Sequence, residues 1–246
     1  MQHFFRFVLA PFIREAGYAK ICEIGACDGG NSELLQTLPG VELTVVDPCM
    51  DFDLEVKFRN SPRTTVMRAL SLEALARMEE PFDCFLIDGD HNWYTVTREL
   101  EAIDRKDLLK PGGAIFLHDV GWPYGRRDLY YLPDSIPVEH RQPYEKNGIV
   151  RGQSRLAPSG INGHLFNAVR EGGPKNGVLT AIEDFVKERK SKYRFFRLEE
   201  EYGLGVVVRR DGAADEIRGA KWAFRFRSRR LVRRLKDAAK LLLGRR

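Results

Sequence analysis

Two predicted strands, 83–87 and 114–117, run directly into acids and histidines. The side chains that follow these strands are Asp88, Asp90, His91, His118 and Asp119. An imidazole titrates near neutral pH and can act as a general base, and carboxylates offer hard oxygen ligands to a cation. Unpaired charges are costly at the ends of buried strands, so five ionisable groups in these places indicate a functional site.

The order of strands and helices positions these side chains together. A helix is expected over 95–102, and the turn Pro111-Gly112-Gly113 precedes the second strand. In open α/β sheets, ligands bind beyond the carboxyl ends of the strands. We therefore expect the five side chains to meet at that edge of one sheet.

An earlier strand, 19–24, ends in a glycine-rich turn that leads into a helix at 32–38. The turn is Glu-x-Gly-x-x-x-Gly from Glu23 to Gly29, whereas a dinucleotide site would carry G-x-G-x-x-G. A carboxylate at Glu23 repels a pyrophosphate and suits a cationic ligand with an amino group, which favours S-adenosylmethionine (SAM) over NAD. The pattern resembles motif I of the class I methyltransferases.

The second predicted strand, 41–46, ends in Asp47, which lies 24 residues after Glu23. A carboxylate there can accept hydrogen bonds from both ribose hydroxyls, although a simple turn acid is the alternative. After a third, edge strand at 63–68, Ser71 precedes a helix at 72–78. In the resembled family this loop contacts the adenine, and the alternative for Ser71 is an N-cap.

The string I-D-G-D-H at 87–91, followed by P-G-G-x-x-x-x-H-D at 111–119, carries a more specific resemblance. It is similar to the small-molecule and sugar O-methyltransferases typified by macrocin O-methyltransferase, over roughly residues 19–120. This resemblance implies a magnesium site at Asp88, His118 and Asp119, with His91 as general base and Asp88 in the catalytic site. The cofactor contacts that it implies are Glu23, Gly25, Ala26, Gly29, Asp47, Ser71 and Asp88.

His118 departs from the family pattern, because an acidic residue is usual at that place and imidazole is a poor magnesium ligand. Three alternatives stay open: His118 favours manganese or another transition ion, hydrogen-bonds the substrate, or replaces the metal altogether. For His91 the alternative is an ordinary first residue of the helix that begins near Asn92. A sugar hydroxyl is a poor nucleophile, so a base with a pKa near 7 and a metal would both assist it.

Residues 121–178 show little periodicity over nearly sixty residues and follow directly after Asp119. We expect them to form a lid over the site, since disordered loops, the alternative, are seldom this aromatic. Side chains expected to stack on a substrate ring or to hold a phosphate or carboxylate are Trp122, Tyr124, Tyr130, Arg126 and Arg127.

The last two predicted strands, 193–198 and 204–209, follow an amphipathic helix at 177–190 and are in hairpin order. A hairpin matches the antiparallel end of a methyltransferase sheet, whereas a dehydrogenase would more often continue in parallel. The resemblance therefore implies an α/β fold class: a Rossmann-like seven-stranded sheet in the order 3-2-1-4-5-7-6, with its last strand antiparallel and helices on its faces. This methyltransferase domain spans 1–210 and includes the lid.

Residues 211–246 are expected to form a basic amphipathic helix. Residues 217–246 hold twelve Lys or Arg and one acid, a net +11, so the net charge of +5 leaves −6 for the other 216 residues. An apolar stripe consists of Leu231, Leu235, Ala238 and Leu242. The helix could pack on its own domain or on a partner subunit in a homo-oligomer, lie on an anionic membrane surface, or bind nucleic acid.

Length and composition suit one α/β domain with additions. The sequence has no run of about 18 apolar residues, so no membrane span is predicted. Residues 4–13 are interpreted as a packing helix. The four cysteines lack metal-type spacing, which favours a reducing cytoplasm. We therefore expect a SAM-dependent O-methyltransferase acting on a small-molecule hydroxyl, best a sugar in a glycan or natural-product pathway. The alternatives are a nucleic-acid methyltransferase, disfavoured by Ile87-Asp88-Gly89-Asp90 in place of an Asn/Asp-Pro-Pro-Tyr turn, and a hydroxylase-like or non-catalytic scaffold.

Overall fold

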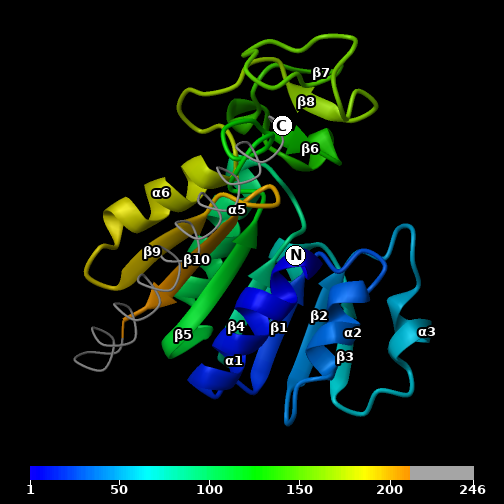
Figure 1. Cartoon of the computed structure of the whole chain (residues 1–246), viewed down its shortest axis with the longest axis vertical. Helices are drawn as coiled ribbons and strands as arrows, with labels where there is room; N and C mark the ends of the chain where they lie inside the picture. Colours follow the sequence, from blue (N-terminus) through cyan, green and yellow to red (C-terminus); the bar gives the residue numbers. More distant parts are fainter. Residues whose placement is uncertain (211–246) are drawn as a thin grey trace, which may run out of the picture.

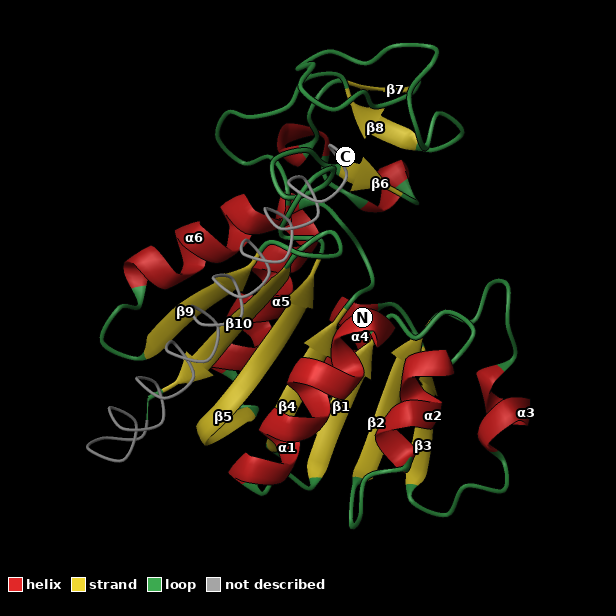
Figure 2. Cartoon of the chain, viewed as in Figure 1, coloured by secondary structure: helices red, strands yellow, loops and turns green. Residues whose placement is uncertain are grey.

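A computed structural model describes residues 1–210, where helices cover both faces of a seven-stranded sheet (Figures 1 and 2). The strand order is β3-β2-β1-β4-β5-β10-β9. The strands are β1 (Lys20–Ile24), β2 (Glu42–Asp47), β3 (Thr64–Arg68), β4 (Phe82–Ile87), β5 (Leu109–His118), β9 (Tyr193–Leu198) and β10 (Leu204–Arg209). β1 to β5 are parallel and β10 is antiparallel to β5, which confirms the predicted fold class and strand order.

Alternating side chains of the strands divide the apolar core into two layers. Ile21 of β1 packs in one layer with α1 (Ala10–Ala16), and Cys22 packs in the other. α2 (Gly30–Gln36) and α3 (Leu54–Phe58) belong to the first layer. The second layer contains α4 (Ser71–Arg77), α5 (Trp93–Arg105) and α6 (Val178–Glu188). A short 3-10 turn (Gln2–Phe4) and a π-helical turn (Phe5–Leu9) precede α1.

Two glycines bring the ends of β1 and β4 into contact. Gly25 has a φ of +82°, and a Cβ there would lie 2.4 Å from the Cα of Gly89. Its backbone N–H donates to the carbonyl of Val46 at 2.8 Å, so the end of β2 is joined as well. Because only glycine tolerates both this conformation and this approach, the turn fixes where Asp88 leaves the sheet.

The segment between β5 and α6 has regular structure of its own. Its strands β6 (Leu129–Tyr130), β7 (Tyr144–Lys146) and β8 (Phe166–Ala168) form a small sheet in the order β6-β8-β7, which lies beyond the carboxyl ends of β4 and β5 (Figure 1). Two 3-10 turns, Pro133–Ser135 and Val138–His140, complete it. Strands of two or three residues carry no detectable periodicity, so the sequence pattern missed them.

Asp128 anchors this segment, called the insertion below, to the main domain. Its Oδ1 accepts from the backbone N–H groups of Trp93 at 2.7 Å and Gly177 at 2.6 Å, where α5 and α6 begin. Its Oδ2 accepts from the hydroxyl of Tyr130 at 2.7 Å. Asp128 is fully buried, and these bonds act together with a small apolar cluster of Tyr124, Leu129 and Ile149 in holding the insertion in place.

Two side chains predicted to contact substrate have structural roles instead. Arg127 is fully buried and donates to the carbonyls of Ala168 and Ser154. Tyr130 is 1% exposed. The predicted contacts of these two residues with substrate are therefore wrong, because buried groups cannot reach it. Arg126 pairs with Glu183 of α6 at 2.7 Å, but its side chain is 39% exposed, and its substrate contact stays a prediction.

The predicted basic helix of residues 211–246 lies outside the described residues. Within residues 1–210, none of the helices combines the length and apolarity that crossing a bilayer requires.

Replacing Asp128 by Ala should cost about 3–5 kcal/mol of folding free energy, because two backbone N–H groups and a hydroxyl lose their buried acceptor. Asp128→Asn keeps one acceptor oxygen and should cost less. Urea unfolding measures both. Asp134→Ala, whose side chain is fully exposed, is the matched control and should change stability by less than about 0.5 kcal/mol. Equal stability of all three variants would exclude the anchoring role.

Candidate active site

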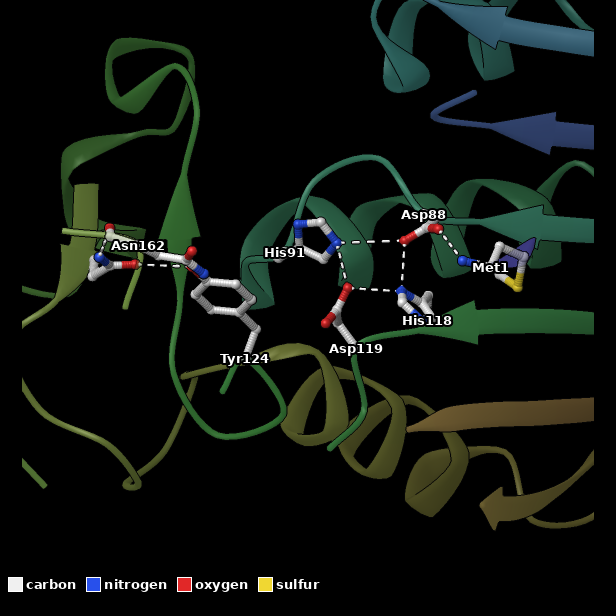
Figure 3. A network of polar contacts seen from close by, with 8 residues as sticks. Met1, Asp88, His91, His118, Asp119, Tyr124 and Asn162 are labelled. Atoms are coloured by element: carbon white, nitrogen blue, oxygen red, sulfur yellow. Dashed lines mark hydrogen bonds and ion pairs between the residues drawn. The ribbon is translucent and has the colours of Figure 1, made fainter. Parts of the chain in front are cut away.

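Four of the five side chains predicted to meet at the sheet edge, all but Asp90, form one cluster (Figure 3). Nδ1 of His118 lies 3.0 Å from Oδ1 of Asp88 and 2.8 Å from Oδ2 of Asp119. Nε2 of His91 lies 2.9 Å from the same Asp119 oxygen and 3.6 Å from Asp88 Oδ1. The second oxygen of Asp88 accepts from the amino group of Met1 at 2.8 Å. All four side chains of the cluster are largely buried.

The register of the sheet explains this meeting. Ile87 of β4 pairs with Leu117 of β5, so Asp88 and His118 leave the sheet side by side. Asp119 then turns back toward them with a φ of +57°, an unusual conformation for a residue other than glycine. Such local strain is common where a side chain must be aimed at a site.

His91 reaches the cluster from the loop before α5, and the insertion holds it there. Its carbonyl accepts from the backbone N–H of Leu129 at 3.0 Å. Its ring stacks on Tyr124 at a centroid distance of 5.6 Å and meets the edge of Tyr131 at 5.9 Å. Asn92 caps α5 by accepting from the N–H of Thr95. His91 therefore lies before the helix, and its backbone is not held in the helical conformation.

The cluster carries two negative and two positive side chains. Burial opposes charge on both histidines, but Asp119 raises the pKa of His91 well above its usual value, and Asp119 with Asp88 raises the pKa of His118 to about 9. Burial alone would raise the pKa of Asp88 and of Asp119, yet the histidines outweigh it and hold both far below the usual range. Both imidazoles therefore carry a proton at neutral pH in the ligand-free protein.

Two cavities meet at this cluster. The smaller, about 320 Å³, lies over the ends of β1, β2 and β3, and the larger, about 630 Å³, lies between the cluster and the insertion. Residues that line both are Gly25, Cys27, Asp88 and Tyr131. A group passed from a ligand in one cavity to a ligand in the other would cross beside Asp88.

The predicted cofactor residues divide between the two cavities. Asp47 and Ser71 line the smaller one, while Glu23 and Ala26 line the larger one. Ser71 is the first residue of α4, whose N-cap residue is Leu70. Gly29 lines neither cavity; it is the N-cap residue of α2 and lies against the ring of Phe58. Asp90, expected in the cluster, lines the smaller cavity instead and accepts from the hydroxyl of Thr95.

Two of these acids also support the turn after β1. Glu23 is 1% exposed and accepts from Asn31 at 2.6 Å and Ser32 at 2.5 Å, and burial raises its pKa to about 7. Oδ2 of Asp47 accepts from the N–H groups of Ala26 and Cys27 at 2.9 and 3.0 Å. The carboxylates predicted to bind the cofactor thus hold its glycine turn in shape.

The donor atoms of Asp88, His118 and Asp119 lie within 4.8 Å of one another, close enough to share one metal ion. Two carboxylates and an imidazole form a mixed oxygen and nitrogen set, which fits manganese or another first-row transition ion better than magnesium. Nδ1 of His118 faces both carboxylates, and its Nε2 is buried with no hydrogen-bond partner in residues 1–210. Nδ1 is therefore the ligand atom that this side chain offers.

Sequence reasoning missed two side chains of the larger cavity. Tyr131 and Asn162 both line it, and the Nδ2 of Asn162 donates to the hydroxyl of Tyr124 at 2.8 Å. Tyr131 follows Tyr130, which was predicted instead, and the two-residue strand β6 carries no periodicity that could have distinguished them. Nothing in the sequence near Asn162 marks it, because its place depends on how the insertion folds.

Comparisons with known proteins agree with this fold. A family model described as a methyltransferase domain matches residues 22–120. The fold is similar to a Podospora anserina methyltransferase, PaMTH1, bound to S-adenosylhomocysteine (SAH), with a TM-score of 0.52 and 14% identity over 82% of this chain and 76% of that chain. It is also similar to an O-methyltransferase from Bacillus cereus in complex with SAH, with a TM-score of 0.50 and 15% identity over 82% and 79% of the two chains. Curated proteins gave no match.

The matched segment and the strand order of the sheet are those of a SAM-dependent methyltransferase domain. The match contains β2 to β5 and the last three residues of β1, and with them every side chain of the acid–histidine cluster. The insertion and the final hairpin lie outside the matched residues.

The cluster should make stability depend on pH in protein treated with a chelator. The folded pKa of His118 is about 9 against about 6.5 in an unfolded chain, so its contribution is complete below about pH 6.5 and lost as the pH rises through 9. The difference in melting temperature between wild type and His118→Asn should therefore shrink between pH 6.5 and pH 9.5. The buried acids outside the cluster, Glu23 and Glu99, titrate in both proteins and cancel. A constant difference would contradict the raised pKa.

Proposed function

We propose that this methyltransferase transfers the methyl group of SAM to a hydroxyl of a small molecule, best a sugar in a glycan or natural-product pathway. The observation that carries the proposal is the junction of two cavities at Asp88, one lined by the predicted cofactor residues Asp47 and Ser71 and one lined by the acid–histidine cluster. The Bacillus cereus neighbour, described as an O-methyltransferase, supports a hydroxyl acceptor by analogy.

The walls of the larger cavity suit a sugar. One side carries the polar cluster, and the other carries the aromatic rings of Tyr124 and Tyr131 with Ile161 and Leu165. A sugar ring has polar hydroxyls and apolar C–H faces, so it can bond to one wall and pack on the other. The volume of about 630 Å³ is within the range of small-molecule sites.

In this proposal SAM lies in the smaller cavity, with Asp47 near its ribose and Ser71 near its adenine, and extends past Gly25 toward Asp88. SAM already carries an activated methyl group, so the protein contributes mainly position and a proton acceptor. His91 is the proposed proton acceptor, because it lies between the insertion and Asp88, the residue that lines both cavities. It must first lose the proton that Asp119 stabilises.

Asp88, His118 and Asp119 are the proposed metal ligands. A divalent ion there would supply a Lewis acid for the developing alkoxide. Positive charge beside the two carboxylates weakens their hold on the His91 proton, so His91 can then accept one. The insertion is the proposed lid. The proposed location is the cytoplasm, with which four cysteines that form no disulfide are in keeping.

Mass spectrometry of a panel of uncharged glycosides and phenols, incubated with the protein and SAM, tests the transfer directly. A product heavier by one methylene group is expected from a glycoside. His91→Gln should lower kcat on that product about 10²–10⁴-fold, because a hydroxyl needs a positioned base. Phenols reacting in place of glycosides would contradict the sugar assignment. Unchanged turnover in His91→Gln would exclude the base role.

Calorimetric titration with MnCl2 and with MgCl2 tests the metal. Manganese should bind more tightly than magnesium, and its affinity should rise with pH because it competes with protons for the cluster. Asp119→Asn should abolish this binding, whereas Asp134→Ala, at an exposed site in the insertion, should leave it unchanged. Absence of heat with either ion in wild type would remove the metal from the proposal.

A further inference from the structure

Exposed apolar side chains of residues 1–210 gather around the smaller cavity. Among the large hydrophobic residues that are exposed there, those lining this cavity are Met50, Phe52, Leu70, Tyr131 and Leu132. Their exposed fractions run from 38% to 62%. Apolar side chains scattered on a surface need no explanation, but a group around one cavity marks a binding surface.

This apolar rim has two sides that come from different parts of the chain. Met50, Phe52 and Leu70 belong to the loops after β2 and β3, where cofactor contacts were predicted. Tyr131 and Leu132 belong to the insertion, and Ile136, 3% exposed, lines the cavity behind them. The insertion, expected as a lid for the acceptor, thus also forms a wall of the predicted cofactor cavity.

We propose that the turn Tyr131–Ile136 is the outer wall of the nucleoside site, so that the adenosine part of SAM is packed between Leu132 and the opposite rim at Met50 and Leu70. The inference rests on the cofactor site of the proposed function. A purine is flat and largely apolar on its faces, so two apolar walls on opposite sides of a cavity match it.

The turn is built as a fixed wall. The N–H of Ser135 donates to the carbonyl of Leu132 at 3.0 Å, and the N–H of Ile136 to that of Pro133 at 3.1 Å. Nε of Arg141 donates to the carbonyl of Ile136 at 2.6 Å. A wall ordered before the ligand arrives loses little conformational entropy on binding, so its contacts add to affinity.

The residue that precedes the turn holds it to the anchor of the insertion. The hydroxyl of Tyr130 donates to Asp128 and accepts from the N–H of Gln142 at 2.8 Å. Tyr131 then lines both cavities, with its ring against His91. The same short stretch therefore contacts the cofactor site, the acceptor site and the proposed base.

Calorimetric titration with SAH tests the wall without an acceptor. Leu132→Asp should weaken SAH binding about tenfold or more, because it replaces an apolar contact of the ligand by a charge. Leu132→Met keeps an apolar side chain of similar size and should stay within about twofold of wild type. Val138→Asp places the same charge at a 74% exposed position that does not line the cavity, and it should also stay within about twofold.

The outcomes separate the claim of an apolar wall from the claim of a cofactor site. Melting temperatures confirm that the variants are folded. Equal SAH affinity in wild type and Leu132→Asp would overturn the wall while leaving the cofactor site in place. Equal weakening by Leu132→Asp and Val138→Asp would also overturn it, because the effect would then be one of charge on the insertion. Absence of SAH binding in wild type would instead remove the proposed function.

Discussion

The arrangement of the site depends on balancing two buried carboxylates. Asp88 and Asp119 both lie within 3.0 Å of one imidazole nitrogen of His118, and neighbouring carboxylates in such a place cannot both stay ionised without positive charge between them. His118 and His91 supply that charge, and the main chain of the insertion holds His91 in position. The charge balance at the sheet edge therefore depends on the folding of the insertion.

The backbone meets this requirement through close contact at the strand ends. Gly25 and Gly89 bring β1 and β4 together, and the β4–β5 register brings Asp88 beside His118. The insertion uses a different principle, since fully buried polar groups such as Asp128 and Asn167 hold it. The side-chain amide of Asn167, for example, donates to the carbonyls of both Asn147 and Asn162. The apolar sheet thus positions the charged side chains of the cluster, and a buried polar network positions the insertion, which forms the opposite wall of the larger cavity.

The parts that sequence reasoning could predict are those set by periodicity. Apolar runs separated by helices and glycine turns located the strands, the methyltransferase resemblance supplied their order, and the positions after the strand ends identified Asp88, His91, His118 and Asp119. Contacts between distant segments could not be predicted, because strands of two or three residues have no period and Asp128 resembles any loop acid. Tyr131 was missed for the same reason, and the roles of Arg127 and Tyr130 were wrong because their burial depends on that network.

His118 changes what the cluster needs. An acid at this position would place three carboxylates against the single imidazole of His91, an arrangement that a bound cation would have to neutralise. With His118 the cluster has two carboxylates and two imidazoles, and protons alone neutralise it. A metal ion must then displace those protons, so its affinity and the availability of His91 as a base depend on pH together. The departure from the family pattern thus couples the two chemical roles proposed for this site.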